Sequence, residues 1–279
     1  MKILVTGGGG TLARVLSGAL AREHEVLCVA RRELDVTDGV AIGRCLDGFQ
    51  PDWVAHLAAL TDVDRCQREP DLAFAVNAVA TENLARTCDE RGIGVLFSSS
   101  LAVFDGHKSA PYTESDGPNP ANLYGASKRR GEEAVAGLRR HLIVRTGWLV
   151  EGSAADTKFV GRVLRHAAEG RPLRAVVDKV GSPTSVQDLS HAIVRLLAGR
   201  AQGLRHVVNA GGPVSRFDLA RRVAAIAGLD VEVEPVSSDA FPGLAPRPTM
   251  EAGVSEHGDA GLRHWTEALA DCLRPISRR

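Results

Sequence analysis

The sequence predicts an α/β fold: a Rossmann-type, doubly wound parallel sheet with a smaller α/β part at the C-terminal end. Three observations support this prediction. Short apolar runs alternate with longer stretches whose apolar residues recur at helical spacing, which is typical of strands and helices that alternate along the chain. The runs are apolar throughout, as expected for strands that are covered on both faces. A cluster of glycines follows the first run, where such a fold needs a tight turn into its first helix.

The first half of the chain contains the expected sheet. Its candidate strands are five apolar runs, at residues 2–6, 26–30, 53–58, 95–97 and 142–145. Helical spacing of apolar residues predicts a helix over residues 12–20 and a longer one over residues 70–91. We therefore expect residues 1–150 to form one sheet-bearing domain.

The pattern loosens after about residue 150. We expect helices over residues 157–169, 187–197 and 217–227, and strands over residues 173–177 and 206–208. Ser215 is a suitable N-cap for the third of these helices, and Asp218 adds a favourable charge in its first turn. The proline-rich stretch 237–248 predicts a loop. Residues 151–279 are thus expected to form a smaller substrate-binding domain over the carboxyl edge of the sheet, with some strands or helices returning to the first domain.

The composition is that of an ordinary globular protein. Of 279 residues, 44% are hydrophobic, and the 34 basic side chains balance the 34 acidic ones. This balance predicts neither a nucleic-acid nor a membrane partner. The apolar start of the chain is shorter than a signal-peptide core of about 7–15 residues, which indicates a cytoplasmic protein. The cysteines and histidines lack metal-ligand spacing, so we expect no metal. The oligomeric state is left open, with a homodimer as one alternative.

The glycine-rich run TGGGGTLA, residues 6–13, lies between the first expected strand and the first expected helix. Glycines permit a tight turn, let backbone N–H groups approach a pyrophosphate and place that group at the helix N-terminus. A merely flexible turn is the alternative, but the strand–turn–helix setting favours dinucleotide binding. The expected contacts are Gly7, Gly9, Gly10, Thr11 and Leu12.

Two arginines, Arg31 and Arg32, follow the second expected strand, where NAD-binding folds often have an acidic residue. A guanidinium group pairs with a 2′-phosphate, which a carboxylate would repel. The pair therefore favours NADP(H), with NAD(H) as the alternative cofactor and two solvated arginines as the other interpretation. Asp35, followed by Val36, is expected to accept a hydrogen bond from the adenine amino group, unless it only belongs to a turn.

Candidate catalytic groups come from two segments. Ser98-Ser99-Ser100 end the fourth expected strand, and Tyr124 and Lys128 follow a stretch rich in helix breakers. On a helix, a spacing of four residues puts Tyr124 and Lys128 on one face. A neighbouring ammonium lowers the pKa of a phenol from about 10 towards neutrality, and a serine hydroxyl can hold a carbonyl oxygen while hydride arrives. We therefore predict that Ser100, Tyr124 and Lys128 are the catalytic residues of a NAD(P)-dependent oxidoreductase, and that residues 1–150 bind the cofactor.

Together these segments resemble the extended short-chain dehydrogenases, most closely the dTDP-4-dehydrorhamnose reductase family. The resemblance runs through residues 51–59, 62–64, 103–106, 111–114, 124–128, 131–132, 145–148, 181–184 and 247–248. It implies NAD(P)H-dependent reduction of the C4 ketone of a nucleotide-linked 4-keto-6-deoxyhexose. The implied roles are general acid for Tyr124, ribose anchor and pKa modulator for Lys128, and carbonyl positioning for Ser100.

The same resemblance implies further contacts. Those with the cofactor are Leu57, Ala58, Ala59, Tyr124, Lys128 and, near the nicotinamide, Thr146. Those with the substrate are Ser100, Leu101, Val103, Trp148 and Arg247, the last as a clamp on the diphosphate unless it only faces solvent. Asn77 is expected near the helix that joins the fourth and fifth strands, although packing explains it nearly as well. His56 is expected to be a buried core histidine rather than a base.

Leu101-Ala102 departs from the reductase pattern, which usually has an acidic and then an aromatic residue at these positions. Serines followed by small residues are more similar to sugar-nucleotide epimerases. A nucleotide-sugar 4-epimerase with tightly bound NAD is therefore the second hypothesis, and a catalytically silent, reductase-like regulatory subunit is the third. The two arginines favour the reductase, and the retained catalytic residues count against the silent subunit. A 4,6-dehydratase would need Asp-Glu at positions 101–102, which this chain lacks.

Overall fold

The computed structural model describes residues 1–152, 156 and 158–274. Within them, a parallel sheet of six strands has the order β10-β5-β4-β3-β1-β2. The strands are β1 (Lys2–Thr6), β2 (Glu25–Val29), β3 (Trp53–His56), β4 (Gly94–Ser100), β5 (His141–Thr146) and β10 (Gly203–His206). The chain leaves β1 in one direction to β2 and returns to β3 on the other side. Ligands of such sheets bind outside the carboxyl ends of the strands at this reversal point.

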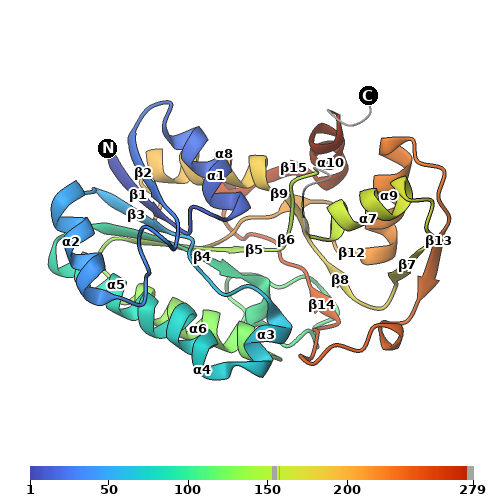
Figure 1. Cartoon of the computed structure of the whole chain (residues 1–279), viewed down its shortest axis with the longest axis horizontal. Coiled ribbons are helices and arrows are strands. Elements are labelled where there is room, and N and C mark those ends of the chain that lie inside the picture. Colours follow the sequence, from blue (N-terminus) through green and yellow to red (C-terminus); the bar gives the residue numbers. More distant parts are fainter. Residues whose placement is uncertain (153–155, 157, 275–279) are drawn as a thin grey trace.

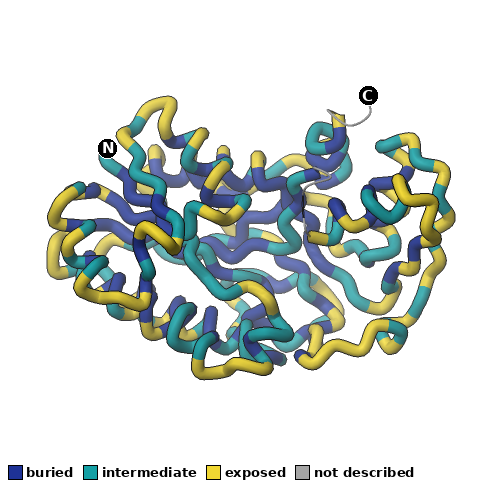
Figure 2. The backbone as a smooth tube through the Cα atoms, viewed as in Figure 1, coloured by how far each residue is buried: buried dark blue, intermediate teal, exposed yellow. Residues whose placement is uncertain are grey.

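Helices cover both faces of the sheet (Figure 1). One face carries α1 (Thr11–Leu20) and α8 (Val186–Ala198), and the other carries α2 (Gly39–Phe49), α5 (Ala80–Glu90) and α6 (Leu123–Ala136). Alternate positions of β1 supply the two cores: Ile3 and Val5 pack with α1 and α8, whereas Leu4 packs with α2 and α5. The four inner strands, β1, β3, β4 and β5, are accordingly buried along most of their length (Figure 2). The doubly wound α/β fold predicted from the alternation of elements is confirmed.

The long helix expected over residues 70–91 is interrupted. It consists of α4 (Pro70–Phe74), one π-helical turn (Ala75–Val79) and α5, and is preceded by the short α3 (Val63–Arg68). Such turns occur often at functional sites because they redirect side chains. Here the turn contains Asn77, whose side chain is fully buried and hydrogen-bonds both backbone groups of Leu60 and the hydroxyl of Ser127. It therefore ties the loop after β3 to α6.

A smaller lobe lies beside the carboxyl edge of the sheet (Figure 1). Its helices are α7 (Phe159–Ala168), α9 (Arg216–Ala227) and α10 (Trp265–Leu273). Its strands are β6 (Trp148–Val150), β7 (Leu173–Val176), β8 (Val180–Gly181), β9 (Pro183–Ser185), β11 (Asn209–Ala210), β12 (Val214–Ser215), β13 (Val233–Val236), β14 (Met250–Glu251) and β15 (Leu262–His264). Between β9 and β11 the chain returns to the main sheet, where α8 packs against one face and β10 forms an edge strand.

Local expectations in this lobe are met to different degrees. The side chains of Ser215 and Asp218 form a capping box at the start of α9, as their positions predict. The helix expected over residues 157–169 begins at Phe159, and residue 157 lies outside the described residues. The strand expected at residues 206–208 is wrong by about three positions, because β10 pairs with β5 and its last pair is His206 with Arg145. The expected loop 237–248 contains one 3-10 turn, Ser238–Ala240. None of the helices in the described part of the chain has the length and hydrophobicity of a membrane span.

Candidate active site

A cavity of about 1470 Å³ opens between the carboxyl edge of the sheet and the smaller lobe. Its lining comes from the ends of β1 to β5 and, across from them, from β6, α7, β7, α9 and the chain around β14. Small-molecule pockets usually have about 300–1,000 Å³. The cavity therefore has room for a dinucleotide together with a second ligand.

The glycine-rich loop forms one end of this cavity. Gly7 has φ of +77°, and a Cβ atom on it would lie 2.7 Å from the backbone nitrogen of Ala58, so only glycine fits here. Gly10 precedes α1, which has neither a side-chain cap nor an acidic residue in its first turn. The helix N-terminus therefore faces the cavity without a competing carboxylate, as pyrophosphate binding requires. The expected cofactor residues that line this end are Gly7, Gly9, Gly10, Thr11, Leu12, Leu57, Ala58 and Ala59.

The two arginines after β2 differ in position. Both are exposed, but Arg31 lines the cavity and Arg32 does not. The Nε atom of Arg31 lies 3.3 Å from Oδ2 of Asp35, which lines the cavity together with Val36. Asp35 also accepts hydrogen bonds from the backbone and hydroxyl groups of Thr37, and these bonds lower the pKa of its carboxyl group. Arg31 alone of the pair is therefore placed to meet a phosphate in this cavity.

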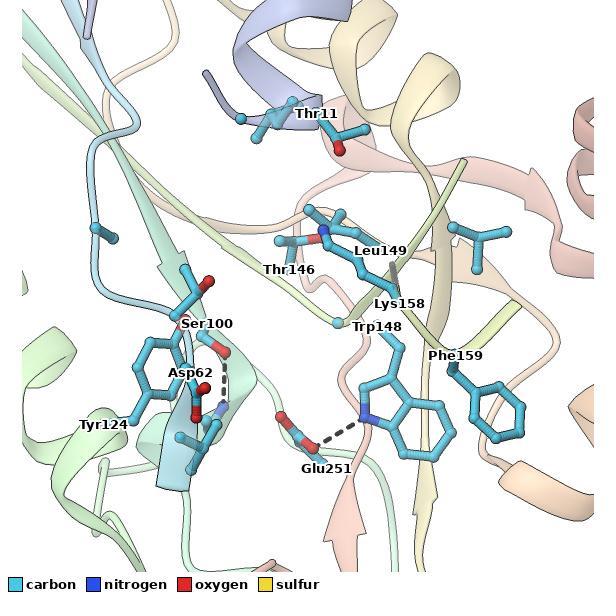
Figure 3. Close-up of a pocket in the computed structure, with 18 of the residues that line it drawn as sticks. Thr11, Asp62, Ser100, Tyr124, Thr146, Trp148, Leu149, Lys158, Phe159 and Glu251 are labelled. Carbon is cyan, nitrogen blue, oxygen red and sulfur yellow. Dashed lines mark hydrogen bonds between the residues drawn. The ribbon is translucent and has the colours of Figure 1, made fainter. Parts of the chain in front are cut away.

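Ser100 and Tyr124 meet at the carboxyl end of β4 (Figure 3). The Oγ atom of Ser100 accepts a hydrogen bond of 3.1 Å from the backbone N–H of Ala102, which fixes the hydroxyl at the end of the strand. Tyr124 lies in the first turn of α6, whose N-cap Asn122 accepts from the backbone N–H of Gly125 at 2.9 Å. Desolvation raises the pKa of Tyr124 to about 12, although the Ser100 hydroxyl acts against it.

Lys128 is not among the groups that shift the pKa of Tyr124 in this structure, so the expected lowering of that pKa by Lys128 stays a prediction. Lys128 is 2% exposed and lines the cavity, but its ammonium lies over the ring of Phe97, 4.0 Å from the ring centroid. Burial lowers the pKa of Lys128 itself to about 7, and the charge of Glu132 opposes that shift. Desolvation thus dominates both groups and keeps the phenol protonated at neutral pH.

A buried ion pair connects α6 to β5. Glu132, one turn after Lys128, accepts two hydrogen bonds from the guanidinium of Arg145 in β5, at 2.8 and 2.7 Å. Both side chains are buried, so each satisfies a charge that would otherwise be unpaired in the core.

His56 is also buried, as expected, between the hydroxyls of Thr6 and Thr81. Thr146, at the end of β5, is among the residues that line the cavity, and its buried hydroxyl has no hydrogen-bond partner among the described residues.

The opposite wall of the cavity is built around Trp148. Its indole N–H donates a hydrogen bond of 2.9 Å to Oε2 of Glu251 in β14 (Figure 3). The guanidinium of Arg216 lies 3.5 Å from the centroid of the Trp148 ring and 4.9 Å from that of Phe159. Desolvation lowers the pKa of Arg216 to about 10, so it keeps its positive charge at neutral pH. Arg247 also lines the cavity, and its guanidinium pairs with Asp64 at 3.0 Å rather than facing solvent alone.

Leu101 and Val103 do not line the cavity, so the expectation that they contact the substrate is not supported. Both are fully buried in a cluster with Phe104 and Tyr112. The 3-10 turn Leu101–Val103 directs these two side chains into the core, while Ala102 between them lines the cavity. The local sequence does not reveal which side chains of this turn enter the core and which one reaches the cavity.

Comparison with known proteins identifies the family. The family model described as the RmlD substrate binding domain matches residues 1–278. The chain belongs to this family. The resemblance inferred from the motifs is therefore confirmed.

Members of the RmlD family with similar sequences carry reductase names. The chain is 37% identical to a dTDP-4-dehydrorhamnose reductase of Mycolicibacterium smegmatis, over 99% of this chain and 86% of that protein. It is 35% identical to a dTDP-4-keto-6-deoxy-D-glucose reductase of Streptomyces niveus, over 97% and 96% of the two chains. A solved dTDP-4-dehydrorhamnose reductase of Bacillus anthracis, in complex with NADP, has a TM-score of 0.94 and 31% identity, over 98% of this chain and 99% of that one.

Sequence reasoning missed several polar residues of this RmlD-family site. Glu132 and Arg145 both lie in segments that carried the resemblance, but nothing in their spacing indicates that they pair across 13 positions. Glu251 and Arg216 had no signal at all, because each belongs to a short element of the smaller lobe. For Arg216, the sequence predicted only that it begins the helix after the N-cap Ser215.

Proposed function

We propose that this protein reduces the C4 ketone of a nucleotide-linked 4-keto-6-deoxyhexose with NADPH. The observation that supports this most is that Ser100, Tyr124 and Lys128 line the same cavity as the glycine-rich loop and Arg31. A carbonyl-reducing group and a dinucleotide cradle thus open onto one space. The reductase names of the full-length relatives agree with this activity.

Each part of the cofactor has a counterpart in the chain. The N-terminus of α1 and the loop of Gly7, Gly9 and Gly10 bind the pyrophosphate. Arg31 pairs with the 2′-phosphate, which favours NADP(H) over NAD(H), in line with the NADP in the Bacillus anthracis structure. Asp35 and Val36 border the adenosine, and Thr146 lies near the nicotinamide end. When bound, NADPH supplies the hydride.

The protein's own groups handle the proton and the charge. Tyr124 is protonated at neutral pH because its pKa is raised to about 12, so it can donate its proton to the ketone oxygen as negative charge develops there. The hydroxyl of Ser100 donates a hydrogen bond to the same oxygen and holds it in place. Lys128 anchors the ribose and offsets the charge of the phenolate that Tyr124 leaves behind.

The smaller lobe provides the substrate side, so we propose that residues 1–150 serve mainly the cofactor and residues 151–279 mainly the sugar nucleotide. Apart from Glu251, the charged side chains that the lobe presents to the cavity are cationic: Lys158, Arg162, Arg174, Lys179, Arg216 and Arg247. Such a cluster inside a cavity favours a diphosphate. Trp148 forms the wall that faces the sugar, opposite Ser100 (Figure 3).

We further propose a cytoplasmic enzyme whose ligands are small molecules rather than nucleic acids. All five cysteines are free, as expected in a reducing compartment, and the net charge is zero. A homodimer stays a prediction, which light scattering of the purified protein would test.

The test is a mixture of purified protein, NADPH and either dTDP-4-dehydrorhamnose or dTDP-4-keto-6-deoxy-D-glucose. We expect absorbance of the reduced cofactor to fall only when protein and sugar are both present, with NADH giving a lower rate. No consumption with either sugar, together with NAD that copurifies and interconversion of C4 epimers, would reject the reductase in favour of the epimerase.

A further inference from the structure

Glu251 is a carboxylate on the wall of the cavity that faces the reacting groups. It is the last residue of β14, which pairs in parallel with β8 so that Glu251 lies beside Gly181. Figure 3 shows its carboxylate between Trp148 on one side and Ser100 and Tyr124 on the other. A sugar whose ketone meets Ser100 and Tyr124 therefore faces the wall of the cavity that carries Glu251.

Trp148 holds one oxygen of this carboxylate in place. Three contacts fix Trp148. Its indole N–H donates to Oε2 of Glu251, and Arg216 stacks on the face of the ring. The backbone N–H of Trp148 donates to the carbonyl of Ser182 at 2.8 Å. A Cβ atom on Gly181 would overlap the indole, so the ring packs directly on the backbone of β8. Oε2 is thereby committed to a rigid partner, while Oε1 is not.

The charge of the Glu251 carboxylate raises the pKa of Arg216, but no hydrogen bond from the described residues reaches Oε1. Among the described residues, Glu251 makes no ion pair within 4.0 Å and no other side-chain hydrogen bond than the one from Trp148. The other acidic residues of the lining are differently engaged: Asp62 caps α3 by accepting from the backbone of Arg65, and Asp35 accepts from Thr37. Glu251 is also the acidic residue whose charge raises the pKa of Tyr124, which agrees with its place beside the phenol.

We propose that Glu251 determines substrate specificity, by accepting a hydrogen bond through Oε1 from the sugar hydroxyl that neighbours the reacting ketone. This inference rests on the proposed function. In a 4-keto-6-deoxyhexose, C5 carries the methyl group and the ring oxygen, so the neighbouring hydroxyl is the one on C3. A carboxylate only accepts hydrogen bonds, and it would lose its water without replacement if C3 carried no hydroxyl. The preferred substrates are therefore 4-keto sugars with a free C3 hydroxyl.

The experiment compares two sugars in wild-type protein and in Glu251→Gln. The sugars are dTDP-4-keto-6-deoxy-D-glucose and its 3-deoxy analogue. We expect the wild type to prefer the hydroxylated sugar by about 10- to 100-fold in kcat/KM, the range for a hydrogen bond to a charged group. Glutamine retains an oxygen for the indole N–H of Trp148 but then turns its NH₂ group to the sugar. The preference should fall about tenfold or more, while the dissociation constant of NADPH stays the same.

Two further variants make the result decisive. Asp62→Asn changes another carboxylate of the same cavity and should leave the ratio between the two sugars unchanged. Glu251→Asp keeps the charge and shortens the side chain, so it should give an intermediate ratio even if the glutamine variant folds poorly. Equal losses on both sugars in Glu251→Gln would overturn the inference, because Glu251 would then only hold Trp148. A wild type that reduces both sugars equally well would also overturn it and leave the reductase intact, whereas a wild type that reduces neither would reject the proposed function itself.

Discussion

Tyr124 and Lys128 are both withdrawn from bulk water, and desolvation acts on them in opposite directions. Burial favours the neutral form of each group, so the pKa of Tyr124 rises to about 12 and that of Lys128 falls to about 7. The direction at Tyr124 suits a proton donor more than a base. At the scale of single residues, Tyr124 of the free enzyme thus carries the proton that reduction of a ketone needs.

Replacing the phenol hydroxyl tests this role. Tyr124→Phe should lower kcat by about 10²- to 10⁴-fold, the usual contribution of a general acid, while NADPH binds within about twofold of wild type. Steady-state rates and fluorescence titration of NADPH measure the two quantities. Tyr112 is the other tyrosine of the chain, and it donates to Asp105 away from the cavity, so Tyr112→Phe is the matched control. An equal loss of cofactor affinity in Tyr124→Phe would mean that the ring mainly shapes the cofactor site.

Arg31 and Arg32 form a second matched pair, since only Arg31 lines the cavity. Arg31→Ser should weaken NADPH by about tenfold relative to NADH, because one charge-assisted pair with the 2′-phosphate is lost. Arg32→Ser should change the ratio of the two dissociation constants by less than about twofold. The same ratio in both variants would contradict the assignment of the 2′-phosphate to Arg31.

At the scale of elements, α6 carries two of the proposed catalytic residues and is also closely packed. Tyr124, Lys128 and Glu132 follow one another at intervals of four residues, and Glu132 connects the helix to β5 through Arg145. Where the helix packs closely against its neighbours, glycine leaves the space that a larger side chain would fill. A Cβ atom on Gly125 would overlap the carbonyl oxygen of Ala102, in the turn that follows Ser100. The helix can therefore bring Tyr124 to Ser100 only with glycine at position 125.

Gly125→Ala should therefore separate Tyr124 from Ser100. We expect a loss of about 1–3 kcal/mol in the free energy of unfolding, as for overpacked cores, and a fall in kcat that exceeds the fall in NADPH affinity. Gly137 ends the same helix, and a Cβ atom on it would meet no atom within 4 Å, so Gly137→Ala should change both quantities little. Urea unfolding and initial rates compare them. Wild-type kinetics in Gly125→Ala would show that the turn after β4 adjusts freely.

At the scale of the whole molecule, the two lobes are joined by more than one crossing of the chain. The chain enters the smaller lobe after β5, returns through α8 and β10, and enters it again, so the core on one face of the sheet contains residues from both halves of the sequence. His56 lies in the middle of this sheet and joins β1 to α5 through its two ring nitrogens. Its burial lowers its pKa to about 3.

This buried histidine makes the stability of the fold depend on pH. The unfolded chain takes up a proton at His56 below about pH 6.5, whereas the folded protein does not until about pH 3. The free energy of unfolding should therefore decrease as the pH falls below about 6.5, by up to about 1.4 kcal/mol per pH unit from this group. Urea unfolding at several pH values between 7.5 and 4.5 measures the slope. His56→Gln should flatten it, while the exposed control His107→Gln should not; equal slopes in wild type and His56→Gln would contradict the account.

Much of the fold and of the site was predictable because its signals are local. Apolar runs predicted the strands of the sheet, the glycine run predicted the turn into α1, and the spacing of Tyr124 and Lys128 predicted their common face. The π-helical turn at Asn77 was not predictable, since its residues have the same helical spacing as their neighbours. Nor was the exclusion of Leu101 and Val103 from the cavity, which depends on the path of a single 3-10 turn.

The sequence by itself determined the order of the elements, the family and the candidate reacting groups, because hydrophobic periodicity, backbone freedom and side-chain chemistry are properties of neighbouring residues. Only the tertiary structure decided which way the pKa of Tyr124 moves, which arginine lines the cavity and which carboxylate lies on the wall of Trp148. These depend on desolvation and on contacts such as that between Trp148 and Glu251, 103 positions apart, which arise when the chain folds.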